Sequence, residues 1–270
     1  MPSDGGLPDV SVMAVAIDPL DSAKMLAGGV GGLFRSTDCG NQWLAVNDPD
    51  NPGTDGGIHD IAYNPQSPST VFASGYRNNP RLHFILRSND GGISWEAVYT
   101  GTLYPEGPII PTIAIDPITP ERIYAGVGGS VYQSMDSGET HEFFPIFFSA
   151  FPSIQSIRVH PTQTKRVYAG GSDANETFPL RESLDLGETW RVIAGPPDAN
   201  NGVTTIFIPN DGQDNIYVAI RRDGIYRLNL NYRASAVSRD SWSQYDSTYT
   251  HRQLRRAPSK IHPQQGEPQK

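Results

Sequence analysis

The sequence predicts an all-β fold, a β-propeller made of five four-stranded antiparallel blades. Three observations lead to this prediction. A segment of the form S-x-D-x-G occurs four times along the 270 residues, at spacings of 52, 46 and 49 residues. Two short apolar runs accompany each segment, so each unit has four short strands that bury their faces against the next unit around a channel. The 27 glycines and 23 prolines suit strands joined by tight turns better than helices.

The first element of each unit, strand a, is an apolar run that ends at or next to a proline, and strand b follows after a turn. Strand a is expected at 15–19, 61–65, 113–117, 157–161 and 206–209. Strand b is expected at 25–28, 71–74, 123–126, 167–170 and 216–219. The prolines and glycines between these runs are typical of turns, so the runs are separate strands.

The third element is the S-x-D-x-G box, which is expected to close the hairpin between strands c and d. A short polar side chain can bond the backbone of its own turn, and glycine adopts positive φ at little cost. An aromatic residue three positions after the glycine is expected to pack between blades, although His141 replaces it in the third box. We therefore predict a structural role for Ser36, Asp38, Gly40, Trp43, Ser88, Asp90, Gly92, Trp95, Ser134, Asp136, Gly138, Ser183, Asp185, Gly187 and Trp190.

The box pattern resembles that of the Asp-box (BNR) β-propeller superfamily, which includes sialidases, xyloglucan-active endoglucanases, sortilin-type receptors and photosystem II assembly factors. The resemblance implies the propeller fold. It does not choose a function, because these relatives do unrelated things on one fold.

Five blades are expected at about 13–47, 58–100, 110–147, 154–194 and 203–246, as a single domain after a lead of residues 1–12. Closure of these five into a ring is the first interpretation, and part of a six- or seven-bladed propeller is the alternative. Residues 247–270 carry five basic side chains and no apolar period, which predicts a disordered basic tail.

The composition excludes some classes of function. A net charge of −8 argues against nucleic acid as a partner, because phosphate binding needs a basic face. No apolar run is long enough to span a membrane, and no signal peptide opens the sequence, so a soluble monomer is expected, in a secreted, periplasmic or cytoplasmic location. The scattered histidines and the single cysteine, Cys39, predict no metal site and no cofactor.

Catalytic chemistry has weak support in the sequence. The resemblance to sialidases implies an arginine triad, which does not recur here. The resemblance to xyloglucanases implies a catalytic aspartate where this chain has Gly29. Since most glycoside hydrolysis needs two carboxylates, five acidic residues expected in loops remain as candidates: Asp55, Asp60, Glu106, Asp173 and Glu176.

A binding role is the favoured hypothesis, with a protein or a glycan as the ligand and a glycoside hydrolase as the alternative. Aromatic and arginine side chains are the usual anchors of interfaces. The expected loops 75–83 and 101–108 carry such side chains: Tyr76, Arg77, Arg81, His83 and Tyr104.

Overall fold

The computed structural model describes residues 6–7, 11–46, 55–102, 112–146, 153–172, 179–193, 195, 201–212, 214–229 and 242–244. These residues form five four-stranded antiparallel sheets, each with its strands in chain order, which confirms the prediction of an all-β fold of five four-stranded blades. No helix occurs in the described part of the chain.

Each blade is a meander of four consecutive strands. Blade 1 contains β1 (Val12–Ile17), β2 (Met25–Gly29), β3 (Gly32–Ser36) and β4 (Leu44–Ala45). Blade 2 contains β5 (Gly56–Tyr63), β6 (Val71–Asn78), β7 (Arg81–Ser88) and β8 (Glu96–Thr102). Blade 3 contains β9 (Ile113–Ile115), β10 (Ile123–Val127), β11 (Ser130–Ser134) and β12 (Glu142–Pro145). Blade 4 contains β13 (Ser153–Val159), β14 (Val167–Ser172), β15 (Leu180–Ser183) and β16 (Arg191–Val192). Blade 5 contains β17 (Val203–Phe207), β18 (Asn215–Ile220), β19 (Gly224–Asn229) and β20 (Trp242–Gln244).

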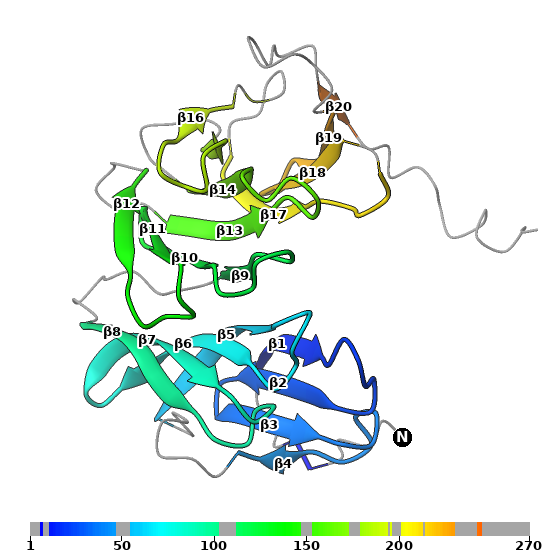
Figure 1. The fold of residues 1–270 in the computed structure, drawn as a ribbon, viewed down its shortest axis with the longest axis vertical. Helices are drawn as coiled ribbons and strands as arrows, with labels where there is room; N and C mark the ends of the chain where they lie inside the picture. The colour runs from blue at the N-terminus through cyan, green and yellow to red at the C-terminus, as the bar shows by residue number, and fades with distance from the viewer. Residues whose placement is uncertain are drawn as a thin grey trace, which may run out of the picture.

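The blades pack face to face through their first strands, since β1 contacts β5, β5 and β13 contact β9, and β13 contacts β17 (Figure 1). The hydrophobic core consists of separate clusters, most of which lie between neighbouring blades. One cluster, for example, joins Tyr124 of blade 3 to Ile154 and Ile157 of blade 4. The core is therefore a series of blade-to-blade interfaces, as expected for a repeat architecture.

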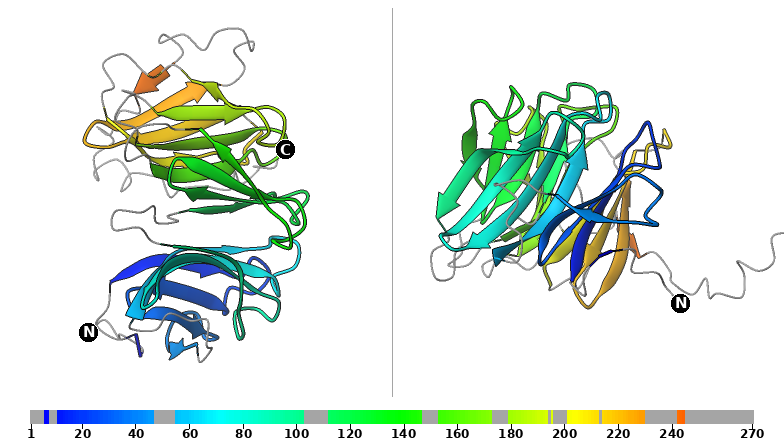
Figure 2. Two further views of the ribbon diagram at one scale, coloured as in Figure 1. Left: turned by 90° about the vertical axis from the view of Figure 1, so that its left-hand side faces the viewer. Right: turned by 90° about the horizontal axis from the view of Figure 1, so that it is seen from below.

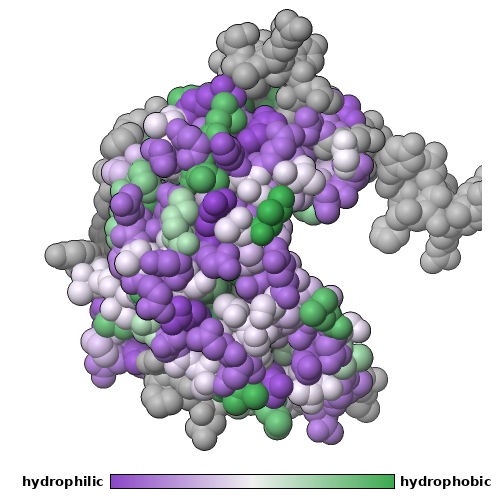
Figure 3. Space-filling view, in the orientation of Figure 1, coloured by the Kyte–Doolittle hydropathy of each residue, from purple (hydrophilic) through white to green (hydrophobic). Residues whose placement is uncertain are grey.

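The five blades form an open arc, which corrects the expectation that they close into a ring. Figures 1 and 2 place blade 1 and blade 5 at opposite ends of the long axis of the molecule. The space-filling view shows a concave notch between these two ends, on the right of Figure 3. The repeated strand runs in the sequence give the number of blades, whereas the angle between blades depends on how their side chains pack.

The four boxes form the turns between the third and fourth strands of blades 1 to 4. In blade 2, the Ser88 hydroxyl donates to the Asp90 carboxylate at 2.8 Å and accepts from the backbone N–H of Gly92 at 2.9 Å. The Trp95 indole donates to the Gly92 carbonyl at 3.3 Å. The residue before the box glycine has a positive φ in all four turns, which are closed by the same hydrogen bonds between serine, aspartate and glycine.

A glycine on the second strand makes room for the next blade. At Gly28, an added Cβ would overlap Ile58 of blade 2, and at Gly126 it would overlap Ile154 of blade 4. At Gly170 it would overlap Val203 of blade 5. The aliphatic residues on the first strand of one blade therefore pack directly over the backbone of the preceding blade.

Several predictions concern residues outside the described part of the chain. These are the basic tail at 247–270, most of the lead at 1–12, and the site candidates Tyr104, Glu106, Asp173 and Glu176.

Candidate functional site

The predicted binding loop at 75–83 is a continuation of two strands, which corrects the loop assignment. Tyr76 and Arg77 lie on β6, and Arg81 and His83 lie on β7, with Asn79 and Pro80 alone between the strands. Both strands have eight residues, because cross-strand pairing continues to Asn78 opposite Arg81. His83 is buried, Tyr76 is half-buried and Arg81 is exposed. The hairpin thus presents a fixed sheet face instead of a loop.

An aromatic stripe crosses all four strands of blade 2 and continues onto blade 3. Tyr76 contacts the His59 ring at 5.3 Å between centroids, and lies directly opposite His83 in the sheet register. The His83 ring stacks on Tyr99 at 5.6 Å, and the Tyr99 hydroxyl lies 3.3 Å from His83 Nε2. We use the name aromatic stripe for the following residues: His59, Tyr76, His83, Tyr99, Tyr132, His141 and Phe143.

The part of the stripe on blade 3 surrounds Tyr99. The Tyr99 ring centroid lies 5.4 Å from that of Tyr132, 5.4 Å from that of His141 and 5.5 Å from that of Phe143. His141 stands at the position that tryptophan occupies in the other three boxes, and it stacks on Tyr132 at 4.9 Å. His141 and Phe143 are exposed, so this end of the stripe meets solvent.

Three polar atoms of the stripe are buried without a hydrogen-bond partner: His59 Nε2, His83 Nδ1 and the Tyr132 hydroxyl. Buried polar atoms are rarely left unsatisfied, and a buried water is the usual partner of such an atom. Burial lowers the pKa of His59 and of His83, because it disfavours the charged imidazolium. Both imidazoles are therefore neutral at pH 7, and one ring nitrogen of His83 is already engaged by the Tyr99 hydroxyl.

This arrangement suits a neutral ligand that has one apolar face and several hydroxyl or amide groups. Aromatic rings bury a large apolar area, and their polar atoms hydrogen-bond the edges of a ligand. Arg81 is exposed at the tip of the same hairpin.

Asp60, a candidate for catalysis, lies on β5 and not in a loop, which corrects the prediction. Its carboxylate accepts hydrogen bonds from the backbone N–H of Ile61 and of Ile113, both at 2.9 Å. Burial raises the pKa of Asp60, while these bonds and the charge of Arg158 oppose the shift. Asp60 thereby joins the first strands of blades 2 and 3.

A pocket of about 410 Å³ opens along the inner strands next to Asp60. Its lining includes Arg158, the apolar residues Ile113 and Val159, and Phe207 of blade 5. The Arg158 guanidinium donates to the carbonyl of Ile157 at 2.7 Å and to the Thr112 hydroxyl at 3.4 Å. The pocket therefore holds one carboxylate and one guanidinium, both engaged by protein groups.

Asp55 precedes β5 and is exposed. Its carboxylate accepts a hydrogen bond at 3.0 Å from the backbone N–H of Asn79, so it ties the start of β5 to the tip of the β6–β7 hairpin. Since Glu106, Asp173 and Glu176 lie outside the described residues, a pair of catalytic carboxylates stays a prediction.

His59 and Tyr99 were missed by the sequence analysis, which searched the expected loops. The alternation of side chains along the strands could have revealed both residues, because residues opposite each other in a sheet share a face.

Among the described residues, no group of three or more His, Cys, Asp or Glu side chains could hold a metal ion. The described residues also include no helix that is long and apolar enough to cross a membrane.

Comparison with known proteins finds xyloglucanases among the curated relatives. The xyloglucanase Xgh74A of Acetivibrio thermocellus is 30% identical over 173 residues, which are 52% of this chain and 20% of the relative. A xyloglucanase of Hypocrea jecorina is 28% identical over 207 residues, which are 62% of this chain and 24% of the relative. The chain thus spans between a fifth and a quarter of the length of these enzymes. No protein-family model matches the chain.

Solved structures with a similar fold include catalytic and binding proteins. The GH74 xyloglucanase from Xanthomonas campestris matches with a TM-score of 0.64 and 19% identity, over 80% of this chain and 36% of the enzyme. YCF48 bound to a peptide matches with a TM-score of 0.56 and 14% identity, over 90% of this chain and 68% of that protein. These matches show the propeller fold.

Proposed function

We propose that this chain, a β-propeller of the Asp-box type, is a non-catalytic binding protein that recognises a neutral glycan along the aromatic stripe. The observation that carries the proposal is the run of rings from His59 through Tyr76 and His83 to Tyr99, of which His59, Tyr76 and Tyr99 are half-buried. A sugar ring has an apolar face for stacking and hydroxyl groups for neutral donors and acceptors.

Two further observations support a glycan over a charged ligand. The lowered pKa of His59 and His83 keeps the middle of the stripe uncharged at neutral pH. The curated relatives are named for their action on xyloglucan, a glycan. Xyloglucan oligosaccharides are therefore the first ligands to test.

The engagement of Asp60 and Asp55, the two catalytic candidates among the described residues, supports binding without catalysis. Asp60 is held by two backbone amides and Asp55 by one. A general acid or base must be free to reach the glycosidic oxygen or a water molecule. A glycoside hydrolase remains the second candidate, supported by the 30% identity with Xgh74A.

The test is calorimetric titration of the protein with xyloglucan oligosaccharides, together with an assay for released reducing ends. Tyr76→Ala is expected to weaken binding about tenfold, as for an aromatic anchor worth more than about 1 kcal/mol. Tyr63→Ala is the matched control, because Tyr63 is a half-buried tyrosine of the same sheet that packs against the cluster shared with blade 1.

Binding that is lost in Tyr76→Ala and kept in Tyr63→Ala supports the stripe as the site. Equal effects of both variants, or no binding of any neutral glycan by the native protein, would refute the proposed site. Release of reducing ends by the native protein would establish the hydrolase instead.

A further inference from the structure

An ion cluster fills the outer groove between blades 2 and 3. The Arg87 guanidinium lies between two carboxylates, with Nη2 at 2.8 Å from Glu96 Oε1 of its own blade and at 2.8 Å from Glu139 Oε1 of the next box. The guanidinium also donates to the carbonyl of Ser137 at 2.9 Å. Since the Arg87 side chain is 12% exposed, these acceptors compensate a largely buried positive charge.

The three charged side chains occupy fixed places in the repeat. The cation directly precedes the box serine, and one acid lies four positions after the box glycine of the same blade. The other acid directly follows the box glycine of the next blade. Between blades 3 and 4, these places hold Gln133, Glu142 and Glu188. Both acids are therefore kept, while a neutral amide replaces the guanidinium.

Gln133 reproduces one contact of Arg87 and leaves the others open. Its Nε2 donates to the carbonyl of Leu186 at 2.6 Å, and Leu186 has the place in its box that Ser137 has in the preceding one. Gln133 is 4% exposed, and its Oε1 is buried without a hydrogen-bond partner. Within the described part of the chain, neither Glu142 nor Glu188 forms an ion pair.

The amide and the two glutamates line a single pocket of about 340 Å³. The rest of its wall consists of Met135, Thr140, His141 and Phe144. A flat, weakly hydrated guanidinium packs well against aromatic rings. The pocket thus combines two carboxylates, a buried acceptor oxygen and an aromatic wall, which are the groups that an arginine side chain requires.

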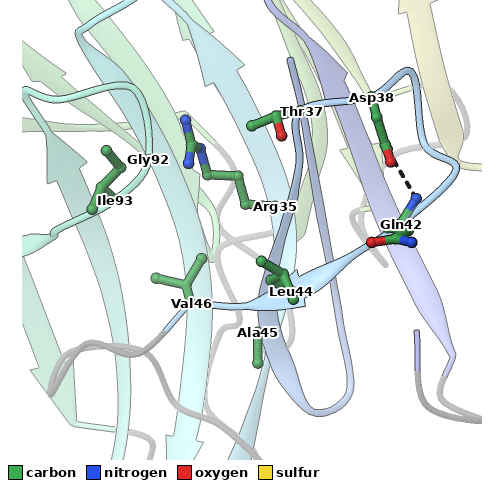
Figure 4. Close-up of a pocket in the computed structure, with 9 residues that line it drawn as sticks. All are labelled: Arg35, Thr37, Asp38, Gln42, Leu44, Ala45, Val46, Gly92 and Ile93. Carbon is green, nitrogen blue, oxygen red and sulfur yellow. Dashed lines mark hydrogen bonds between the residues drawn. The ribbon is translucent and has the colours of Figure 1, made fainter. Parts of the chain in front are cut away.

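The equivalent groove between blades 1 and 2 keeps the cation and lacks both acids. Arg35 extends there towards the second box, and Leu44 and Ile93 hold the two acidic places (Figure 4). Of the three grooves that face a box, only the groove between blades 3 and 4 carries the acid pair without its cation.

We infer that the pocket between blades 3 and 4 binds an arginine side chain of a partner protein, in the arrangement that Arg87 has between blades 2 and 3. The guanidinium fork has enough donors for Glu142, Glu188 and the Gln133 Oε1 together, whereas a lysine ammonium is a compact point charge. The net charge of −8 favours the approach of a basic segment.

The wall of the pocket adds a second feature to the partner. Met135 is 43% exposed and Phe144 is half-buried, so both offer apolar surface beside the carboxylates. The partner is therefore a peptide segment with an arginine next to an apolar residue. This inference is separate from the glycan proposal, because Tyr76 does not line this pocket.

The test is calorimetric titration of the full chain with three short peptides that differ at one position. That position holds arginine, lysine or citrulline and is followed by leucine in all three. Citrulline has nearly the shape of arginine without its charge. The arginine peptide is expected to bind about tenfold more tightly than the citrulline peptide and more tightly than the lysine peptide. Its affinity should fall as the salt concentration rises.

Variants of the pocket locate the binding. Glu142→Gln and Glu188→Gln are each expected to weaken the arginine peptide about threefold, as for a partly exposed ion pair. Gln133→Arg supplies the guanidinium within the chain and is expected to abolish binding, with the fold checked by circular dichroism. Glu121→Gln is the matched control, since Glu121 is an exposed glutamate of blade 3 outside the pocket. Tyr76→Ala should also bind the arginine peptide like the native chain.

Equal affinity for the arginine and citrulline peptides, or binding of neither, would overturn the inference. A lysine peptide that binds as tightly as the arginine peptide would do the same, because it would indicate a general attraction for cations. Binding that survives Gln133→Arg in a folded variant would place the site elsewhere. If Gln133→Arg does not fold, the two glutamate variants decide, and losses no larger than in Glu121→Gln would refute the site.

Discussion

The carboxylate of Asp60 on β5 accepts a hydrogen bond at 2.9 Å from the backbone N–H of Ile113 on β9. This bond joins blades 2 and 3 at their innermost strands, and hydroxyl groups make the same connection in the next two interfaces. A residue that the sequence marks as an acid available for catalysis is thus a connector between blades.

Asp60→Ala is expected to destabilise the protein by about 1.5 to 3 kcal/mol, because it removes a hydrogen bond to a charged group and leaves a buried N–H unpaired. Asp60→Asn is expected to recover most of this loss, since the amide oxygen still accepts from Ile113. Urea unfolding of both variants measures the difference. Equal losses for alanine and asparagine would show that the hydrogen bond is not the cause.

The serine of each box is expected to stabilise the protein through its buried hydroxyl. Ser88 is fully buried and holds both Asp90 and the backbone N–H of Gly92. Ser88→Ala leaves that N–H without a partner, which costs about 1 to 3 kcal/mol. The control is Ser69→Ala at an exposed turn, expected within about 0.5 kcal/mol of the native value. Thermal unfolding would contradict this prediction if the two variants had the same melting temperature.

Stability is expected to decrease as the pH falls below about 6.5, the ordinary pKa of histidine. Burial lowers the pKa of His83 in the folded state, so the unfolded chain takes up a proton that the folded chain does not. The contribution is therefore complete above the unfolded pKa and is lost as pH falls towards the folded pKa. His83→Gln should make the free energy of unfolding depend less steeply on pH, as measured by urea titrations between pH 7.5 and 5. An unchanged pH dependence would show that other groups cause it.

Close packing over Gly170 predicts that substitutions at Gly170 and Val203 have coupled effects on stability. Gly170→Ala is expected to cost about 1 to 3 kcal/mol, because the added methyl overlaps Val203 of the next blade. Val203→Ala should cost less in the Gly170→Ala background than in the native chain, because it removes the clash. A double-mutant cycle by chemical denaturation measures this coupling. Strict additivity would place the strain elsewhere.

The boxes show which features the local sequence is able to predict. Ser88, Asp90 and Gly92 form their turn within five residues, so their pattern predicts the hairpin without knowledge of the rest of the chain. The apolar runs likewise predict strands, and their repetition predicts five blades. These features follow from hydrogen bonds and φ preferences over short distances.

The candidate site illustrates what sequence reasoning could not reach. Tyr76 and His83 were assigned to a loop because the run 75–83 contains glycine, asparagine and proline, yet cross-strand pairing extends both strands to the tip of the hairpin. His59 and Tyr99 join them from β5 and β8, the first and last strands of the blade. Their meeting depends on the register of four strands, which no single segment specifies.

The sequence by itself determined the repeat, the turn chemistry and the four-stranded blade, because each depends on neighbouring residues. The tertiary structure decided that Asp60 connects blades 2 and 3 and that an aromatic stripe crosses blade 2. The physical reason is that burial and contact are properties of the assembled blades: Ile61 is 7% exposed because it packs in the cluster between blades 1 and 2, whereas Val15, at the same place in the repeat, is 56% exposed.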